Sequence, residues 1–139
     1  MIYTKNNYFL DTNILVYAYN SDDGIKCSIA TNLIKSEEND IIISTQVLNE
    51  FCSCLLKHKI QIQEIEYYLN EILGSFDVYQ LKYKTTINAI KLKQKYAYSW
   101  WDSLLLTSAI ENNCSVLYSE DMKHKQIIEN TLEIINPFV

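Results

Sequence analysis

The stretch YFLDTNILVYAY, residues 8–19, places one acid between two apolar runs of different character. Residues 8–10 are typical of the end of a buried strand, residues 11–13 of a turn, and residues 14–19 of the start of a helix. Asp, Thr and Asn all cap helix N-termini, so Asp11 has an ordinary structural explanation at a strand-to-helix turn. A chemical role for Asp11 requires other acids that converge on it.

The composition is that of a compact domain with a substantial core. The chain has 139 residues, of which 48% are hydrophobic and 12% aromatic, and this size predicts a single domain over residues 1–139. The net charge of -5 argues against a protein that coats nucleic acid, but not against an enzyme that contacts a few phosphates. The N-terminus lacks a signal-peptide pattern, and no run approaches the roughly 18 apolar residues of a membrane span. We therefore expect a cytoplasmic protein with no membrane association.

Helical and strand patterns alternate along the rest of the chain. Apolar residues at helical spacing predict helices over residues 25–38, 46–58, 62–73, 85–96 and 100–112, and Gly74 is expected to end the third of these. Short apolar runs predict strands at residues 40–44, 76–81 and 115–119, with a possible further strand at 132–135. Strands separated by helices form right-handed crossovers. We expect an α/β fold, a three-layer α/β/α sandwich around a mostly parallel sheet of four to five strands.

Missing motifs exclude several classes of site. With two Gly and one Pro, the chain has no GxGxxG sequence or P-loop that could hold a nucleotide phosphate. The four cysteines form no CxxC pair, and the two histidines show no metal-ligand spacing such as HExxH. We expect reduced thiols in or near the core, and histidines on the surface.

Four acids occur where the predicted sheet would present a ligand site. Such sheets bind ligands beyond the carboxyl ends of their strands, where the strand order reverses. Asp11 ends the first strand, and Asp121 follows the strand near residue 117. Glu50 lies about one helical turn past the second strand, and Asp102 lies in the first turn of a helix. Each has an alternative explanation, since Asp102 fits a capping box, Asp121 a turn and Glu50 a solvated helix face.

A convergence of four acids requires a cation. Two carboxylates about 4 Å apart repel by about 4 kcal/mol at an effective dielectric constant near 20, so a fold avoids such a cluster unless a cation accompanies it. Oxygen ligands without His or Cys select hard ions, which predicts Mg²⁺ or Mn²⁺. Such an ion can activate water for phosphodiester hydrolysis, and the sequence leaves open whether one ion or two take part.

The chain resembles the PIN-domain family, specifically its stand-alone, VapC-like members, in the segments FLDTNILVYA, VLNEF, SWWDSLLLTSAIENNCSVLYSEDM and IINPFV. The resemblance covers essentially the whole chain. It implies a metal-dependent endoribonuclease that acts on RNA and serves as the toxin of a toxin–antitoxin pair. It also implies a cognate antitoxin protein as partner, and a homodimer.

The resemblance assigns the family's functional residues by motif position. It places the four acids at Asp11, Glu50, Asp102 and Asp121, and the supporting polar residues at Asn13 and Ser119. We expect Asp11 and Asp102 to be direct or near-direct metal ligands, Asp121 to bind directly or through water, and Glu50 to bind through water or to position the attacking water.

The sequence departs from the family pattern at the surface that would grip the substrate. Glu120 takes the variable place within the SED motif and is expected only as a neighbour of the site. Lys125 stands where close relatives often have Gly, and the chain contains no Arg. Neither departure removes a metal ligand.

A basic stretch from Lys82 to Lys95 leads into an aromatic stretch that ends at Trp101. Lysines for phosphates and rings for stacked bases suit single-stranded RNA. The candidate substrate contacts are Lys91, Lys95 and Trp100. The same pattern also fits the solvated face of an ordinary helix followed by core tryptophans.

Two other functions are compatible with a PIN-like sequence. The first is a catalytically silent module that binds RNA or protein, and the intact set of four acids weighs against it. The second is a structure-specific DNA nuclease of the related flap-endonuclease type, and the short chain, without insertions to thread a DNA flap, weighs against that. The RNA target, the cleavage sequence and the identity of the antitoxin are not specified by the sequence.

Overall fold

A six-stranded, mostly parallel sheet forms the middle layer of the protein. The computed structural model describes residues 6–139, and expectations that concern residues 1–5 lie outside it. In chain order the elements are β1 (Asn7–Leu10), α1 (Thr12–Tyr19), α2 (Gly24–Lys35), β2 (Asp40–Ser44), α3 (Thr45–Lys57), α4 (Ile62–Ser75), β3 (Asp77–Tyr79), α5 (Tyr83–Tyr96), α6 (Trp100–Glu111), β4 (Val116–Tyr118), β5 (Ile127–Ile128) and β6 (Leu132–Ile135).

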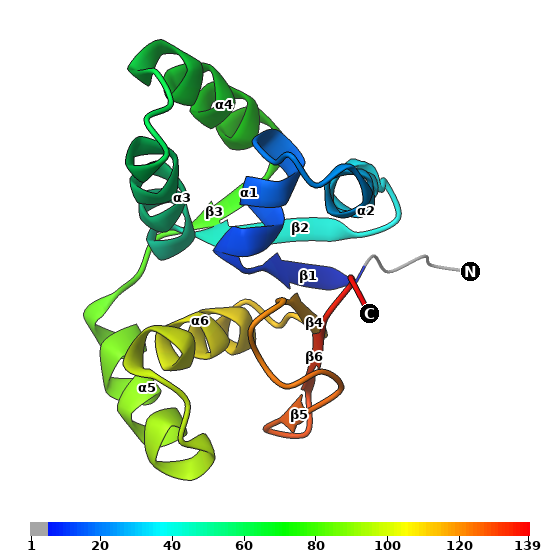
Figure 1. Ribbon diagram of the computed structural model, residues 1–139. Coiled ribbons are helices and arrows are strands. Elements are labelled where there is room, and N and C mark those ends of the chain that lie inside the picture. The colour runs from blue at the N-terminus through cyan, green and yellow to red at the C-terminus, as the bar shows by residue number, and fades with distance from the viewer. Residues whose placement is uncertain (1–5) are drawn as a thin grey trace.

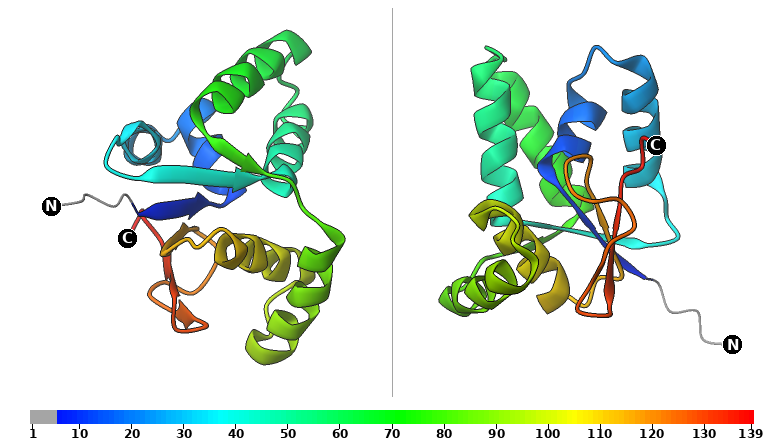
Figure 2. Two further views of the ribbon diagram at one scale, coloured as in Figure 1. Left: turned by 180° about the vertical axis from the view of Figure 1, so that it is seen from behind. Right: turned by 60° about the horizontal axis from the view of Figure 1, so that its bottom comes forward.

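Helices cover both faces of this sheet. The strand order is β3-β2-β1-β4-β6-β5, and all neighbouring pairs are parallel except β5 and β6. The chain first moves from β1 to β3 towards one edge and then returns to place β4 on the other side of β1. Right-handed crossovers in opposite directions put their helices on opposite faces, so α1 to α4 lie on one face and α5 and α6 on the other (Figures 1 and 2). The predicted three-layer sandwich is confirmed.

The core is built on the central strands and on α6. In β2 the four residues after Asp40 are all buried, as predicted for a strand covered on both faces. In α6 the seven consecutive residues from Ser103 to Ala109 are buried, because this helix lies between the sheet and α5. Its buried hydroxyls are satisfied within the helix: Thr107 Oγ1, for example, donates to the carbonyl oxygen of Ser103 at 2.7 Å. The first turn of α6, which carries Asp102, is therefore continuous with a buried and well-packed helix.

The prediction that Gly74 ends a helix is wrong. α4 continues through Ser75, and its C-cap is Phe76 in an extended conformation with φ -121 and ψ 152. A glycine ends a helix by adopting the left-handed conformation, and neither Gly24 nor Gly74 has a positive φ. The Phe76 side chain is buried at 8% exposure, so burial of this ring turns the chain into β3.

Two strands differ from expectation. The strand predicted at residues 76–81 is shortened to Asp77–Tyr79, because it lies at the edge of the sheet and leads directly into α5. The sheet also contains β5, which was not predicted. Two residues in an antiparallel pairing are too short to produce a periodic pattern in the sequence.

The cysteines are unpaired and lie in or near the core as predicted, and one of the two histidines is on the surface as predicted. All four cysteines are unpaired; Cys114 is buried and the other three are half-buried. His58 is exposed, but His124 is half-buried and its Nδ1 accepts the backbone amide of Asn136 at 2.9 Å, so the prediction of a surface residue is wrong there. Among residues 6–139, none of the helices combines the length and apolar character that a membrane span requires.

The last residue of α6, Glu111, connects three elements. Its carboxylate accepts hydrogen bonds from the Tyr79 hydroxyl of β3, from Thr85 Oγ1 at 2.9 Å and from Asn88 Nδ2 at 3.2 Å in α5. Thr85 is fully buried, so its hydroxyl depends on protein partners. Glu111 therefore ties α5 and the edge strand to the central helix.

Glu111→Leu should lower the free energy of unfolding by about 1–3 kcal/mol, because it removes an acceptor that three side chains share, although Tyr79 and Thr85 keep a hydrogen bond to each other. Denaturant unfolding of the variant and the wild type measures this difference. Glu66→Leu, at an exposed position of α4, is the matched control. Equal effects of the two substitutions would contradict the connecting role of Glu111.

Candidate functional site

Asp11 lies at the point where the strand order of the sheet reverses. β1 pairs with β2 on one side and with β4 on the other, and the register sets Leu10 opposite Tyr118. Asp11 and Ser119, the next residues, are therefore neighbours at the carboxyl ends of the two strands. The backbone amide of Asp11 donates to the Tyr118 carbonyl oxygen at 2.9 Å, and Ser119 Oγ donates to Asp11 Oδ2 at 2.7 Å.

Asp11 caps a helix and also belongs to an acidic cluster. It is the N-cap of α1, and its Oδ1 accepts the backbone amide of Thr12 at 2.7 Å. The side chain is only 7% exposed, and this burial raises its pKa to about 6, against the lowering effect of the Ser119 and Thr12 hydrogen bonds. The charges of Asp102 and Glu50 add to the increase. The capping explanation is therefore correct but incomplete.

The structure brings the four predicted acids around one cavity of about 380 Å³. They come from the end of β1, from α3, from the first turn of α6 and from the loop after β4. The residues that line the cavity are Asp11, Thr12, Asn13, Val16, Tyr17, Glu50, Cys54, Asp102 and Asp121. Four segments that are distant in the sequence thus contribute one carboxylate each.

Asp102 is placed by the helix cap that the sequence predicted. Ser99 Oγ accepts the backbone amide of Asp102 at 3.1 Å, which fixes the first turn of α6. Partial burial raises the pKa of Asp102, the Ser99 hydrogen bond lowers it, and the charges of Asp121 and Glu50 raise it again. Asp102 lines the same cavity as Asp11, so the two acids belong to one cluster.

Glu50 is held by two neutral donors. Thr12 Oγ1 donates to its Oε2 at 2.8 Å, and Gln46 Nε2 donates to its Oε1 at 3.0 Å. The sequence analysis missed both partners. Thr12 directly follows the first acid, and Gln46 precedes Glu50 by one helical turn, a spacing at which helix side chains meet. These positions in the sequence were the signals from which the two contacts with Glu50 could have been predicted.

The two predicted supporting residues connect the first and last acids. Asn13 Nδ2 donates to Asp121 Oδ2 at 3.1 Å and lies 3.5 Å from Asp11 Oδ2. Ser119 Oγ, besides its bond to Asp11, accepts the backbone amide of Asp121 at 3.3 Å. The loop after β4 is therefore fixed to the start of α1 by side-chain hydrogen bonds.

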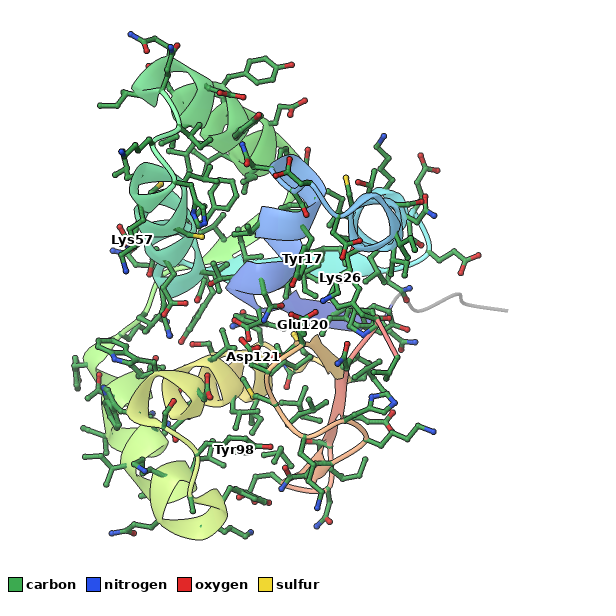
Figure 3. The ribbon with its side chains drawn as sticks, in the orientation of Figure 1. Tyr17, Lys26, Lys57, Tyr98, Glu120 and Asp121 are labelled. Carbon is green, nitrogen blue, oxygen red and sulfur yellow. The ribbon has the colours of Figure 1, made fainter. Side chains whose placement is uncertain are left out.

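Glu120 belongs to a separate polar group beside the cavity. It accepts hydrogen bonds from the Tyr17 hydroxyl at 2.7 Å and from Lys26 Nζ at 2.6 Å. Burial raises the pKa of Glu120, but the hydrogen bonds of Lys26 and Tyr17 outweigh it, so the pKa is lowered. Figure 3 shows these three side chains gathered where α1 and α2 meet the loop after β4, next to Asp121.

The remaining predicted residues lie elsewhere. Lys91, Lys95 and Trp100 do not line the cavity of the acids. Lys95 pairs with Glu129 at 3.2 Å, so it is already engaged. Trp101, which is 62% exposed, lines a neighbouring hollow of about 570 Å³ together with Glu50. Contact between substrate and Lys91, Lys95 or Trp100 stays a prediction.

The carboxylates surround the cavity without forming a ready ligand set. Within residues 6–139, no group of three or more His, Cys, Asp or Glu side chains is arranged so that it could hold a metal ion as it stands. Several of the carboxylate oxygens bond instead to Thr12, Gln46, Asn13 and Ser119. The arrangement is a set of acids pre-oriented by neutral donors.

Solved structures with this fold include bacterial toxins and their complexes. VapBC2 from Rickettsia felis, bound to a DNA fragment from its promoter, is 27% identical, with 94% of this chain and 99% of that chain covered and a TM-score of 0.69. A toxin–antitoxin complex from Klebsiella pneumoniae is 18% identical, with 94% and 97% covered and a TM-score of 0.71. VapC20 from Mycobacterium tuberculosis, a sarcin–ricin loop cleaving toxin, is 17% identical, with 79% and 86% covered and a TM-score of 0.67.

No curated protein matches the sequence of this chain. The family model of the PIN domain matches residues 8–130. This range contains all four acids of the cavity, all of β1 except its first residue, and every element from α1 to β5. The chain therefore belongs to the PIN domain family.

Proposed function

We propose that the protein is a metal-dependent endoribonuclease that hydrolyses phosphodiester bonds in single-stranded RNA, and that it is the toxin of a toxin–antitoxin pair. The observation that carries this proposal is the one cavity lined by an acid from each of four separate segments. Among the structural relatives, one is a sarcin–ricin loop cleaving toxin and another is a toxin–antitoxin complex. These relatives favour RNA as the substrate and an antitoxin protein as the partner.

The donor set of the cavity fits a hard divalent cation. The acids supply carboxylate oxygens, no histidine lines the cavity, and Cys54 is the one sulfur residue among its lining residues. Mg²⁺ and Mn²⁺ prefer such oxygen ligands, and Asp11, Asp102 and Asp121 would hold the ion, with Glu50 acting through water. When bound, the ion supplies a polarised water and neutralises charge on the phosphate. Burial and the neighbouring acids raise the pKa of Asp11 and Asp102 because they disfavour the charged carboxylates. A bound cation would stabilise these charges and so offset both effects.

The chain's own polar residues orient the acids without cancelling their charge. Thr12 and Ser119 each bind one oxygen of Asp11, so its carboxylate cannot rotate freely. Neutral donors also hold Glu50, whose carboxylate would position the water that attacks the phosphate. No nucleophilic side chain is required for this hydrolysis.

The proposal also covers the organisation of the protein. We infer one PIN-like nuclease domain over residues 1–139, a cognate antitoxin, a homodimer and a cytoplasmic location. The family match over residues 8–130 supports the domain assignment, and the toxin–antitoxin complex among the structural relatives supports the antitoxin.

Purified protein should cut single-stranded RNA in Mg²⁺ or Mn²⁺ and stop when EDTA removes the ion. Asp102→Asn should abolish cutting, because it removes a carboxylate charge while the Ser99 cap, which binds the backbone, is retained. The measurement is gel analysis of a labelled RNA, with circular dichroism to show that the fold is intact. Asp22→Asn, at an exposed position, is the matched control and should cut like the wild type.

Three outcomes would redirect the assignment. Full activity of Asp102→Asn, in a preparation free of contaminating nuclease, would remove Asp102 from the catalytic set. RNA binding by the wild type without cleavage would favour a silent interaction module. Cutting of branched DNA in preference to RNA would favour a structure-specific DNA nuclease.

Induced expression of the wild type should arrest growth of a bacterial host, whereas Asp102→Asn should not, because cleavage of host RNA is the proposed cause of arrest. Optical density and colony counts after induction measure the effect at matched protein levels. Equal arrest by both proteins would show that the toxicity arises from aggregation or binding rather than from cleavage.

Asp11→Asn should make the protein more stable in EDTA near pH 7.5. Burial raises the pKa of Asp11 in the folded state to about 6 from an ordinary value of 3.8, so the folded state binds the proton more tightly than the unfolded state. Wild-type stability therefore falls as the pH rises from about 4 through about 6, and the full penalty is present above that range. Asn removes this penalty and keeps an acceptor for the helix cap, so the variant should melt higher by a few degrees, corresponding to about 1–3 kcal/mol.

Thermal melts near pH 7.5 and near pH 4.5, with EDTA and with Mn²⁺, test this prediction. The advantage of Asp11→Asn should shrink at the lower pH, because the wild-type acid is then largely protonated. Mn²⁺ should reverse the order at the higher pH, because an ion stabilises only the protein that binds it. If Asn destabilises the protein in EDTA and Mn²⁺ shifts neither curve, Asp11 is a helix cap and nothing more.

A further inference from the structure

We propose that Gln46 is a positioning residue that fixes Glu50 relative to the first turn of α6, a role that rests on the proposed nuclease function. Gln46 does not line the cavity of the acids. Its amide nitrogen Nε2 nevertheless donates to Glu50 Oε1 at 3.0 Å and to the carbonyl oxygen of Trp101 at 3.0 Å. Trp101 directly precedes Asp102, so one amide group connects the segments that carry two of the acids.

This connection joins helices from the two opposite faces of the sheet. Gln46 lies in the first turn of α3 and Trp101 in the first turn of α6, and these helices belong to opposite faces (Figure 2). The two helix starts meet only beyond the carboxyl edge of the strands. Because the Gln46 side chain is long enough to span this gap, it sets the separation between the α3 acid and the α6 acid.

The chemistry of an amide suits this position. Both partners of Gln46 are hydrogen-bond acceptors, so the NH₂ group and not the oxygen must face them, and its two N–H bonds provide one donor for each. A lysine could also donate to both, but its charge would neutralise Glu50. The amide orients the carboxylate and leaves the charge available.

Each carboxylate oxygen of Glu50 accepts one side-chain hydrogen bond. Thr12 from α1 holds Oε2, and Gln46 holds Oε1. With Gln46 removed, the carboxylate retains a single anchor and can rotate about it. The loss would therefore act on the orientation of Glu50 and not on its presence.

The other end of the amide indicates that this side chain is not optimised for stability. Gln46 Oε1 is buried and, among residues 6–139, it is the one buried side-chain oxygen or nitrogen without a hydrogen-bond partner. An unsatisfied buried group destabilises the folded state. An apolar residue of similar size would remove this penalty but would also remove the two hydrogen bonds of Nε2, so the net effect of replacement on stability should be small.

The test compares Gln46→Leu with Asn49→Leu. Asn49 is also an amide in α3 and lines the same hollow as Gln46, but its Nδ2 donates to the Thr45 carbonyl oxygen of its own helix at 2.9 Å. In Mn²⁺, Gln46→Leu should lower the kcat of RNA cleavage about 10- to 100-fold, with a much smaller change in KM. Asn49→Leu should stay within about twofold of the wild type.

A second readout does not depend on cleavage. Thermal melts over a series of Mn²⁺ concentrations should show that Gln46→Leu requires about tenfold more Mn²⁺ than the wild type or Asn49→Leu for the same increase in melting temperature. In EDTA, Gln46→Leu should melt close to the wild type, because the loss of an unsatisfied oxygen offsets the loss of two hydrogen bonds. Gln46→Glu, which keeps the shape but repels Glu50 and cannot donate, should not rescue either property.

The outcomes separate this inference from the proposed function. If Gln46→Leu behaves like Asn49→Leu in both readouts, or loses activity only in proportion to a lower melting temperature in EDTA, the positioning role is overturned. If the wild type cuts no RNA but responds to less Mn²⁺ than Gln46→Leu, the nuclease proposal fails and the positioning role stands. If Mn²⁺ stabilises none of the proteins and none cuts RNA, both are overturned.

Discussion

The pairing of β1 with β4 is the constraint on which the rest of the structure depends. It places Leu10 opposite Tyr118, so that the first residues beyond each strand, Asp11 and Ser119, become neighbours at the centre of the sheet. A shift of this register by one residue would separate the Ser119 hydroxyl from the carboxylate it binds at 2.7 Å. It would also carry the loop with Asp121 away from α1. Strand geometry, rather than any single ion pair, therefore determines that the acids face one another.

The site maintains negative charge in a partly buried place by means of neutral donors. Thr12, Asn13 and Ser119 contribute one hydroxyl or amide each, all within the short segments that follow β1 and β4. The nearby cation, Lys26, is engaged by Glu120 at 2.6 Å and so forms a neutral pair beside the cavity. This division leaves the mutual repulsion of the acids in place, and together with burial that repulsion raises the pKa of Asp11 and Asp102. Raised pKa values of this kind are typical of sites whose residues are selected for binding or catalysis and not for stability.

The parts of the structure that local sequence patterns encode were predictable, and those that depend on spatial proximity were not. Asp11 and Asp102 stand at helix starts whose capping residues can be recognised in the sequence, and their segments were placed correctly. The contact between Gln46 and Trp101 joins residues 55 positions apart, and only the assembled sheet brings them together. Gly74 was misinterpreted because a glycine near a helix end suggests a left-handed cap, whereas the buried ring of Phe76 decides where that helix stops. β5 was missed because two residues carry no periodicity.

The distance along the chain between Asp11 and Ser119, 108 positions, has a consequence for how the protein is made. The central strand pair joins the beginning of the chain to a segment near its end, and such long-range pairing forms late because the intervening loop must first be closed. A nascent chain that has not yet emerged beyond β4 lacks both this strand pair and Asp121. The acidic cluster is therefore complete only once the segment that carries Ser119 and Asp121 has been synthesised and has joined the strand pair.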